Sequence, residues 1–69
     1  MTERYLSIEG RTSRDEPWEH WKSIPAWILV DKAGLAIQRA HVRELMREDF
    51  GRDSAVYLRI VNDDGVVVA

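Results

Sequence analysis

Three arginines, Arg39, Arg43 and Arg47, recur at every fourth position of segment 38–51. Residues four apart lie on one face of a helix, so these side chains are predicted to form a continuous ridge, called the arginine ridge below. Guanidinium groups bind carboxylates and phosphates through charge-assisted hydrogen bonds. The alternative is a face that is solvated or paired inside the fold. The ridge is therefore one candidate partner-binding surface.

A second candidate surface lies in segment 16–22, which carries Trp18, His20 and Trp21 among charged residues. Aromatic side chains with charged neighbours are typical of the hot spots of protein-binding surfaces. The alternative interpretation is that both tryptophans, together with Trp27, cover a core too small to be closed by aliphatic residues. The sequence leaves both interpretations open.

Groups for catalysis or metal binding are sparse. The chain has no cysteine, which excludes thiolate ligands, disulfides and a cysteine nucleophile. Neither His20 nor His41 has a metal-ligating partner at helical spacing, and the four glycines are isolated rather than gathered in a phosphate-binding loop. Asp63 and Asp64 precede Gly65, which predicts a turn rather than a cation site. The sequence therefore predicts a non-enzymatic protein without catalytic residues, cofactor or metal.

The composition is that of a small folding domain. The 69 residues predict one compact domain, 1–69, and the formal net charge of −2 argues against indiscriminate binding to nucleic acid or acidic membranes. The first residues lack the apolar run of a signal peptide, and no stretch approaches the ~20 apolar residues of a membrane span. We therefore expect a soluble, cytoplasmic protein with no membrane partner.

Segment 38–51 has the clearest helical pattern. It contains good helix formers and no proline, and Gly51 is predicted to cap its C-terminus. The helix dipole disfavours Glu48 and Asp49 in the last turn, so we expect this turn to fray or to be paired with Arg52. At about 100° per residue, one arc collects the apolar side chains of Leu35, Val42, Leu45, Met46 and Phe50.

Alternation of apolar and polar residues predicts strands near both ends of the chain. Segment 3–9 alternates and is predicted to have one polar face. Segments 55–62 and 65–69 flank a tight turn and are predicted to form a hairpin. Between these strands, 16–22 is predicted as a short helix, because Asp15 is a competent N-cap and a proline stands in the first turn.

The segment before the main helix has two interpretations. In the one we favour, 26–30 and 35–38 form a hairpin around a turn that contains Gly34. In the other, a helix over 25–33 turns at Gly34 into a recognition helix over 36–47, and the terminal hairpin becomes a wing.

The predicted fold is α+β, with a small antiparallel sheet of about four to five strands, two hairpins and one main helix packed on it. The alternative fold is a winged helix-turn-helix. We expect the core to consist of Leu6, Ile8, Trp27, Leu29, Leu35, Val42, Leu45, Met46, Phe50, Val56, Leu58 and Ile60.

The predicted function is that of a small protein-binding module that acts by surface contact. In style, though not in residues, the chain is similar to phage-encoded inhibitors or adaptors that block host complexes. The alternative is a winged-helix-like DNA-binding protein that uses the arginine ridge. A protein partner is expected, and nucleic acid and a homodimer stay open as partners. The candidate partner-binding residues are Arg39, Arg43, Arg47, Trp18, His20 and Trp21.

Overall fold

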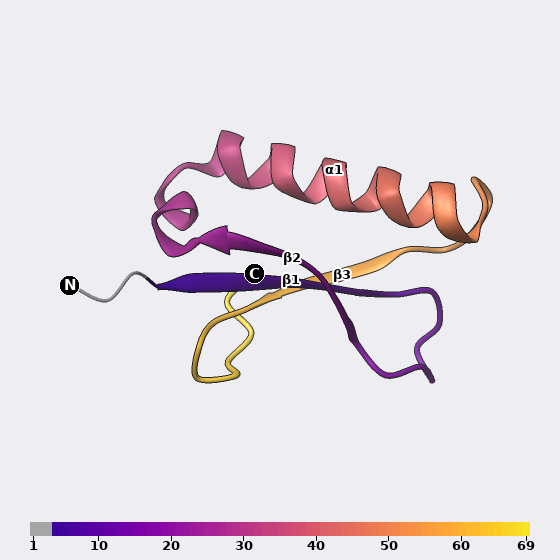
Figure 1. Ribbon diagram of the computed structural model, residues 1–69, viewed down its shortest axis with the longest axis horizontal. Coiled ribbons are helices and arrows are strands. Elements are labelled where there is room, and N and C mark those ends of the chain that lie inside the picture. Colours follow the sequence, from indigo (N-terminus) through magenta and orange to yellow (C-terminus); the bar gives the residue numbers. More distant parts are fainter. Residues whose placement is uncertain (1–3) are drawn as a thin grey trace.

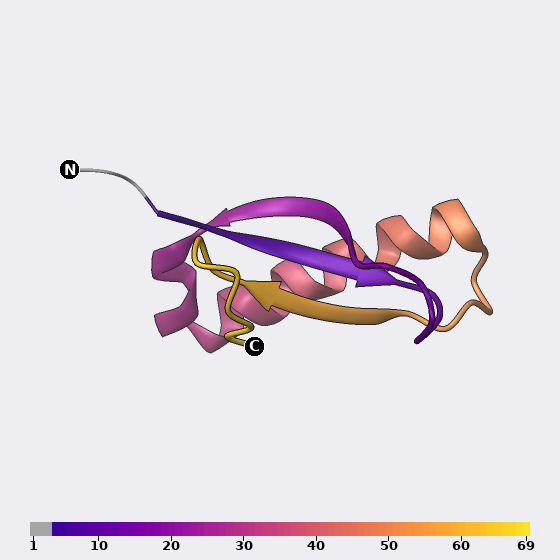
Figure 2. The same cartoon turned by 90° about the horizontal axis from the view of Figure 1, so that it is seen from below.

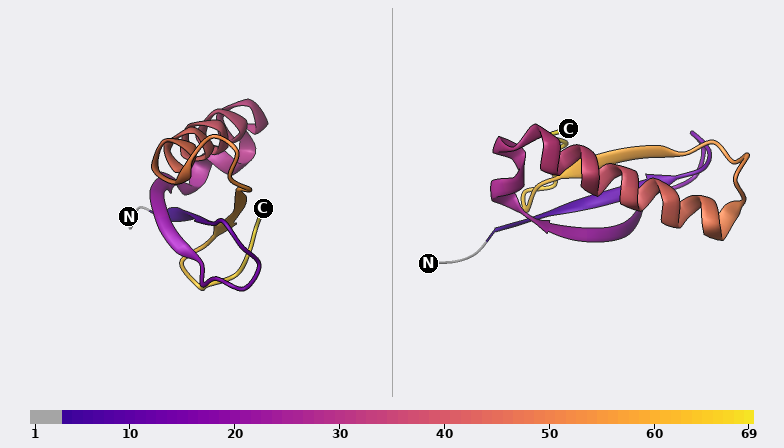
Figure 3. Two further views of the ribbon diagram at one scale, coloured as in Figure 1. Left: turned by 90° about the vertical axis from the view of Figure 1, so that its right-hand side faces the viewer. Right: turned by 90° about the horizontal axis from the view of Figure 1, so that it is seen from above.

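Within residues 4–69, which the computed structural model describes, the chain forms an α+β fold with a three-stranded antiparallel sheet and one main helix (Figure 1). The strand order is β2-β1-β3, so β1 is central (Figure 2). Seen end-on, α1 lies over one face of the sheet, and the opposite face is called the open face below (Figure 3). The elements are β1 (Tyr5–Arg11), β2 (Glu19–Pro25), the 3-10 helix η1 (Ala26–Val30), α1 (Lys32–Phe50) and β3 (Tyr57–Val61).

The central strand β1 alternates between the two faces of the sheet. Leu6, Ile8 and Gly10 are buried, and the residues between them are only partly buried. The strand predicted at 3–9 is thus confirmed over residues 5–9, with the predicted polar face, while Arg4 precedes the strand and residue 3 lies outside the described residues. Gly10 does not end the strand, because it pairs with residues of both β2 and β3.

Strand β2 overlaps the segment that the sequence predicts as a helix, 16–22, and that prediction is wrong. In the antiparallel pairing with β1, Lys22 lies opposite Ile8 and Ile24 lies opposite Leu6. This pairing buries Ile24 almost completely. An isolated helix of seven residues is marginal in water, so burial against a distant strand outweighs the local helical preference.

Asp31 joins η1 to α1. Its N–H donates to the carbonyl of Ile28 at 3.0 Å, and its Oδ1 accepts from the backbone N–H groups of Ala33 and Gly34 at 3.1 and 3.2 Å. An aspartate in this position satisfies two N–H groups of the first helical turn and complements the helix dipole. Because Gly34 has no side chain, the Asp31 carboxylate has room beside it.

Both interpretations of residues 26–38 are therefore corrected. The predicted hairpin of 26–30 with 35–38 is absent from the described structure, since 26–30 forms η1 and 35–38 already belongs to α1. The helix-turn-helix alternative is also wrong, because Gly34 lies inside the first turn of α1 rather than in a turn between two helices. The main helix begins six residues before the predicted 38–51 because Asp31 supplies the cap.

The C-terminus of α1 agrees with the sequence in its glycine cap. Gly51 has φ 104°, and its N–H donates to the carbonyl of Arg47 at 2.9 Å. Arg52 pairs with Glu44 at 3.2 Å rather than with the last turn, where the sequence leads us to expect it. Among residues 4–69, no helix combines the length and apolar character needed to cross a membrane.

The C-terminal hairpin forms only in part. Two backbone hydrogen bonds close the predicted turn. The N–H of Gly65 donates to the carbonyl of Asn62, and the N–H of Asn62 donates to the carbonyl of Val66. Beyond the turn, the described residues of 65–69 contribute one isolated bridge, Val61 with Val67, and no strand of the sheet. The sheet therefore has three strands, and the predicted four to five are not found.

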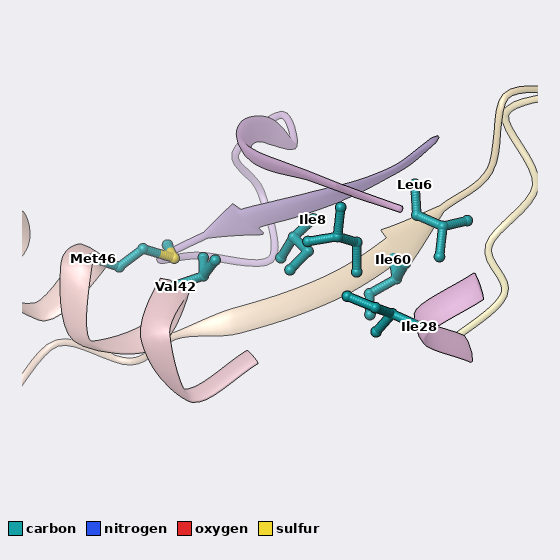
Figure 4. Packing of buried hydrophobic residues seen from close by; sticks show 7 residues of the cluster. Leu6, Ile8, Ile28, Val42, Met46 and Ile60 are labelled. Carbon is teal, nitrogen blue, oxygen red and sulfur yellow. The ribbon is translucent and has the colours of Figure 1, made fainter. Parts of the chain in front are cut away.

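The core lies between α1 and the sheet, with η1 closing one end (Figure 4). Trp27 and Phe50 are wrongly predicted as core residues, since 67% and 44% of their surfaces are exposed. With three residues per turn, η1 directs Ile28 inward and Trp27 outward. Ile24, Ile28 and Val61 are buried core residues that the sequence did not predict. The predicted core residues that are buried are Leu6, Ile8, Val42, Met46 and Ile60. Those that are partly buried are Leu29, Leu35, Leu45, Val56 and Leu58.

Candidate partner-binding surfaces

The arginine ridge lies on α1 with its charges unpaired. Arg43 is exposed, while Arg39 and Arg47 are partly buried. The Nε atoms of Arg39 and Arg47 are buried and have no hydrogen-bond partner. None of the three side chains forms an ion pair with another residue of the described part of the chain. Partial burial of the stems restricts where the guanidinium groups can point, and their charge is left to solvent or to an external anion.

The carboxylates of α1 do not neutralise this ridge. Glu44, which could reach Arg47 one turn away, pairs instead with Arg52. Glu48 and Asp49 are exposed in the last turn, and no ion pair of either is found within residues 4–69. The arginine ridge is therefore not paired with carboxylates inside the fold, which is one of the two forms of the alternative interpretation given above.

The second candidate surface, segment 16–22, is divided between the two faces of the sheet. The register between β1 and β2 shifts between Ile8 and Glu9, which pair with Lys22 and His20 and leave Trp21 between them. Such a bulge re-aims side chains on the bulged strand. Lys22 reaches α1, while His20 contacts residues of the open face. The three residues predicted together here do not form one surface.

Trp21 belongs to the packing of the helix side. Its ring meets Phe50 edge-on, with centroids 6.0 Å apart and an interplanar angle of 69°. It packs against the core cluster, and its Nε1 is buried without a hydrogen-bond partner. Trp21 therefore covers the core beside the end of α1. For this residue the interpretation that the tryptophans close a small core is the correct one.

Trp18 lies against two arginines. The guanidinium carbon of Arg11 is 4.2 Å from the ring centroid, and that of Arg59 is 4.5 Å from it. Arg59 is held in turn by Glu9, whose Oε1 accepts from Nε at 2.7 Å. Cation–π contacts of this kind attract both guanidinium groups to the ring, although the buried Nε of Arg11 has no hydrogen-bond partner. The contacts of Arg11 and Arg59 with Trp18 could not be predicted from the sequence, because only the register of three strands brings these residues together.

His20 is engaged by two hydroxyl groups. Ser7 Oγ is hydrogen-bonded to Nδ1, and Ser23 Oγ lies 3.4 Å from Nε2. A serine–histidine contact is one element of nucleophile activation, but that chemistry also needs a group that orients the histidine. Here the second ring nitrogen meets another hydroxyl. His41 Nδ1 lies 3.1 Å from Nζ of Lys22, which links α1 to β2. Residues 4–69 contain no cluster of three or more His, Cys, Asp or Glu that could hold a metal ion.

One end of the molecule exposes apolar side chains beside two hollows. The first, of about 290 Å³, is lined by Arg4, Tyr5, Trp27 and their neighbours. The second, of about 260 Å³, shares Arg4 and Tyr5 with the first and extends to Asp63 and Asp64. Sequence reasoning placed Trp27 in the core and therefore missed this region. The helix η1 starts directly after a proline that ends a strand. No local sequence pattern predicts that this start is exposed.

Comparisons with protein-family models, with curated proteins and with solved structures gave no match.

Proposed function

We propose that this chain is a small, non-enzymatic protein-binding module whose arginine ridge binds an acidic segment of a protein partner. The observation that supports it is the absence of any ion pair of Arg39, Arg43 or Arg47 within residues 4–69. Of the other five arginines, Arg52 and Arg59 pair with carboxylates and Arg11 lies on an aromatic ring, while Arg4 and Arg14 form no ion pair within residues 4–69 and are not part of a ridge. Three adjacent uncompensated cations on a rigid helix are an arrangement that an external anion would stabilise.

The geometry of the ridge favours a partner with regularly spaced carboxylates. Residues four apart on a helix are about 6 Å apart along its axis, so the three arginines span about 12 Å. A partner helix with acidic residues at positions i, i+4 and i+8 has the same spacing. Because the arginine ridge has no carboxylate partners inside the fold, it also lets a module of this kind select its partner by charge. Charge complementarity contributes more to specificity than to affinity.

A protein partner is favoured over duplex DNA for two reasons. Duplex DNA carries about one negative charge per 1.7 Å of its axis, so the net charge of −2 and the exposed Glu48 and Asp49 repel it more strongly than a peptide whose few carboxylates face the arginine ridge. In addition, α1 is one continuous helix packed on a sheet and is not the second helix of a helix-turn-helix. An inhibitor or adaptor that blocks a complex by contact is the role that fits a module without catalytic groups.

A titration by fluorescence anisotropy tests the proposal. The probes are a labelled helical peptide with glutamates at i, i+4 and i+8, its glutamine counterpart and a labelled DNA duplex. At about 0.01 M salt, where the screening length is about 30 Å, we expect the glutamate peptide to bind more tightly than the other two probes. Added salt should weaken this binding. Tighter binding to the duplex, or equal binding of the glutamate and glutamine peptides, would contradict the proposal.

A further inference from the structure

Six of the large apolar side chains that are substantially exposed lie toward one end of the molecule. In Figure 1 this is the end where β1 begins, β2 finishes and η1 and the C-terminal turn lie. Exposed apolar residues gathered beside hollows mark interaction sites more often than isolated ones do. Three of these residues line a hollow, Tyr5, Trp27 and Val68, and the other three, Val30, Val66 and Val67, do not.

The two hollows at this end adjoin each other, because both are lined by Arg4, Tyr5 and Ala26, and together they are called the groove below. The first hollow is apolar, with Pro25 and Trp27 completing its walls. Its volume of about 290 Å³ lies at the lower limit for ligand pockets, about 300–1,000 Å³. That size suits one large apolar side chain of a peptide better than a cofactor.

The second hollow has a different character. Asp63 and Asp64 line it, and neither forms an ion pair within residues 4–69. The turn that carries them is held by the side chain of Asn62, whose Oδ1 accepts from the N–H groups of Asp64 and Val66. The two carboxylates therefore take no part in holding the turn and are available to a cation. Arg4 stands between the halves, so the acidic end of the groove carries the excess charge.

We propose that this groove binds an extended peptide segment of a partner protein, with a large apolar side chain against Trp27 and a lysine or arginine beside Asp63 and Asp64. Charge complementarity selects the basic residue, and the apolar hollow selects the anchor. An exposed tryptophan in a groove is the type of residue that dominates binding energy at interfaces. Arg4, at the junction, can donate hydrogen bonds to carbonyls of the extended peptide.

This groove is independent of the arginine ridge in both its residues and its chemistry. The ridge is basic and selects acidic groups, whereas the groove selects an apolar residue followed or preceded by a basic one. Two sites of opposite preference on one small chain are what an adaptor needs to hold two partners together. The inference goes beyond the proposed function and would survive its failure.

Selection from a displayed library of random seven-residue peptides tests the groove. We expect the wild-type chain to enrich peptides with a large apolar residue within about two positions of a lysine or arginine, because neighbouring residues of an extended chain are about 3.3 Å apart. Trp27→Ala should weaken the selected peptides more than about tenfold. Replacing both Asp63 and Asp64 by asparagine should weaken them about two- to fivefold and remove the preference for basic residues.

Two control variants make the result specific. Ile37→Ala removes an apolar side chain that is as exposed as Trp27, 67%, but lines neither hollow. Arg43→Glu alters the arginine ridge alone. Both should leave the selection unchanged, with circular dichroism confirming that every variant folds. No enrichment, enrichment of acidic peptides, or equal losses for Trp27→Ala and Ile37→Ala would overturn the proposal. So would a concentration-dependent dimer in sedimentation velocity that Trp27→Ala abolishes, which would assign this end to a second copy.

Discussion

The thioether of Met46 lies so close to Gly10 that a β-carbon on the glycine would stand 2.5 Å from Sδ. The same β-carbon would stand 3.2 Å from Cδ2 of Leu58. Glycine at position 10, one residue before the end of β1, is therefore what lets α1 approach the central strand. Met46 is completely buried, so its side chain has little space into which it can move.

Gly10→Ala is expected to destabilise the fold by about 1–3 kcal/mol, the usual cost of overpacking a core. Met46→Ala should cost about 2–5 kcal/mol through the cavity it leaves. In the double variant the added methyl group enters that cavity, so the two losses should sum to more than the measured loss. Chemical denaturation of the four proteins checks this. Additive losses would show that Gly10 and Met46 do not compete for one space.

The start of α1 makes a second stability prediction. Asp31→Ala removes the cap on Ala33 and Gly34 and should lower the free energy of unfolding by about 0.5–2 kcal/mol. Asp31→Asn retains an accepting oxygen and should cost less. If helix content and stability were unchanged in Asp31→Ala, the start of α1 at residue 32 would be in doubt. Circular dichroism and denaturation measure both quantities.

The contacts of Arg11 and Arg59 with Trp18 lead to a third stability prediction. Arg59→Ala removes a cation–π contact and a partly exposed ion pair with Glu9, each of which contributes less than about 1 kcal/mol. We expect a combined loss of about 1–2 kcal/mol, smaller when Trp18 is already alanine, because the two changes then remove the same contact. Arg14→Ala, in the exposed β1–β2 loop, is the matched control and should be neutral. Thermal unfolding at equal ionic strength gives the comparison.

What the sequence predicts well is what local patterns determine. The apolar arc with Val42 and Met46, the glycine cap at Gly51 and the alternation of β1 each depend on neighbours along the chain, and the structure confirms them. The arginine ridge also follows from spacing alone. Whether its charges are paired could not be predicted, because that depends on where carboxylates of other elements lie.

The failures have different physical origins. Segment 16–22 has a cap, a first-turn proline and tryptophans at helical spacing, yet pairing with β1 converts part of it to strand. Gly34 favours a turn locally, but the carboxylate of Asp31 makes it part of a helix. Trp27 is large and apolar, yet the geometry of η1 leaves it exposed. Only the first of these outcomes depends on a contact distant in sequence. The other two follow from local geometry, the cap of Asp31 on Gly34 and the turn of η1, that the apolar pattern does not report.

The central claim is that Arg43, in the middle of the arginine ridge, meets a carboxylate of the partner, and a charge-exchange experiment tests it most directly. Arg43→Glu should weaken binding of the glutamate peptide by about tenfold or more, which corresponds to about 1.4 kcal/mol. A peptide with lysine at its central position should bind Arg43→Glu better than it binds the wild-type chain. Arg14→Glu, the same charge change in an exposed loop, should show neither effect. Equal weakening by Arg43→Glu and Arg14→Glu, without recovery on the lysine peptide, would contradict the account.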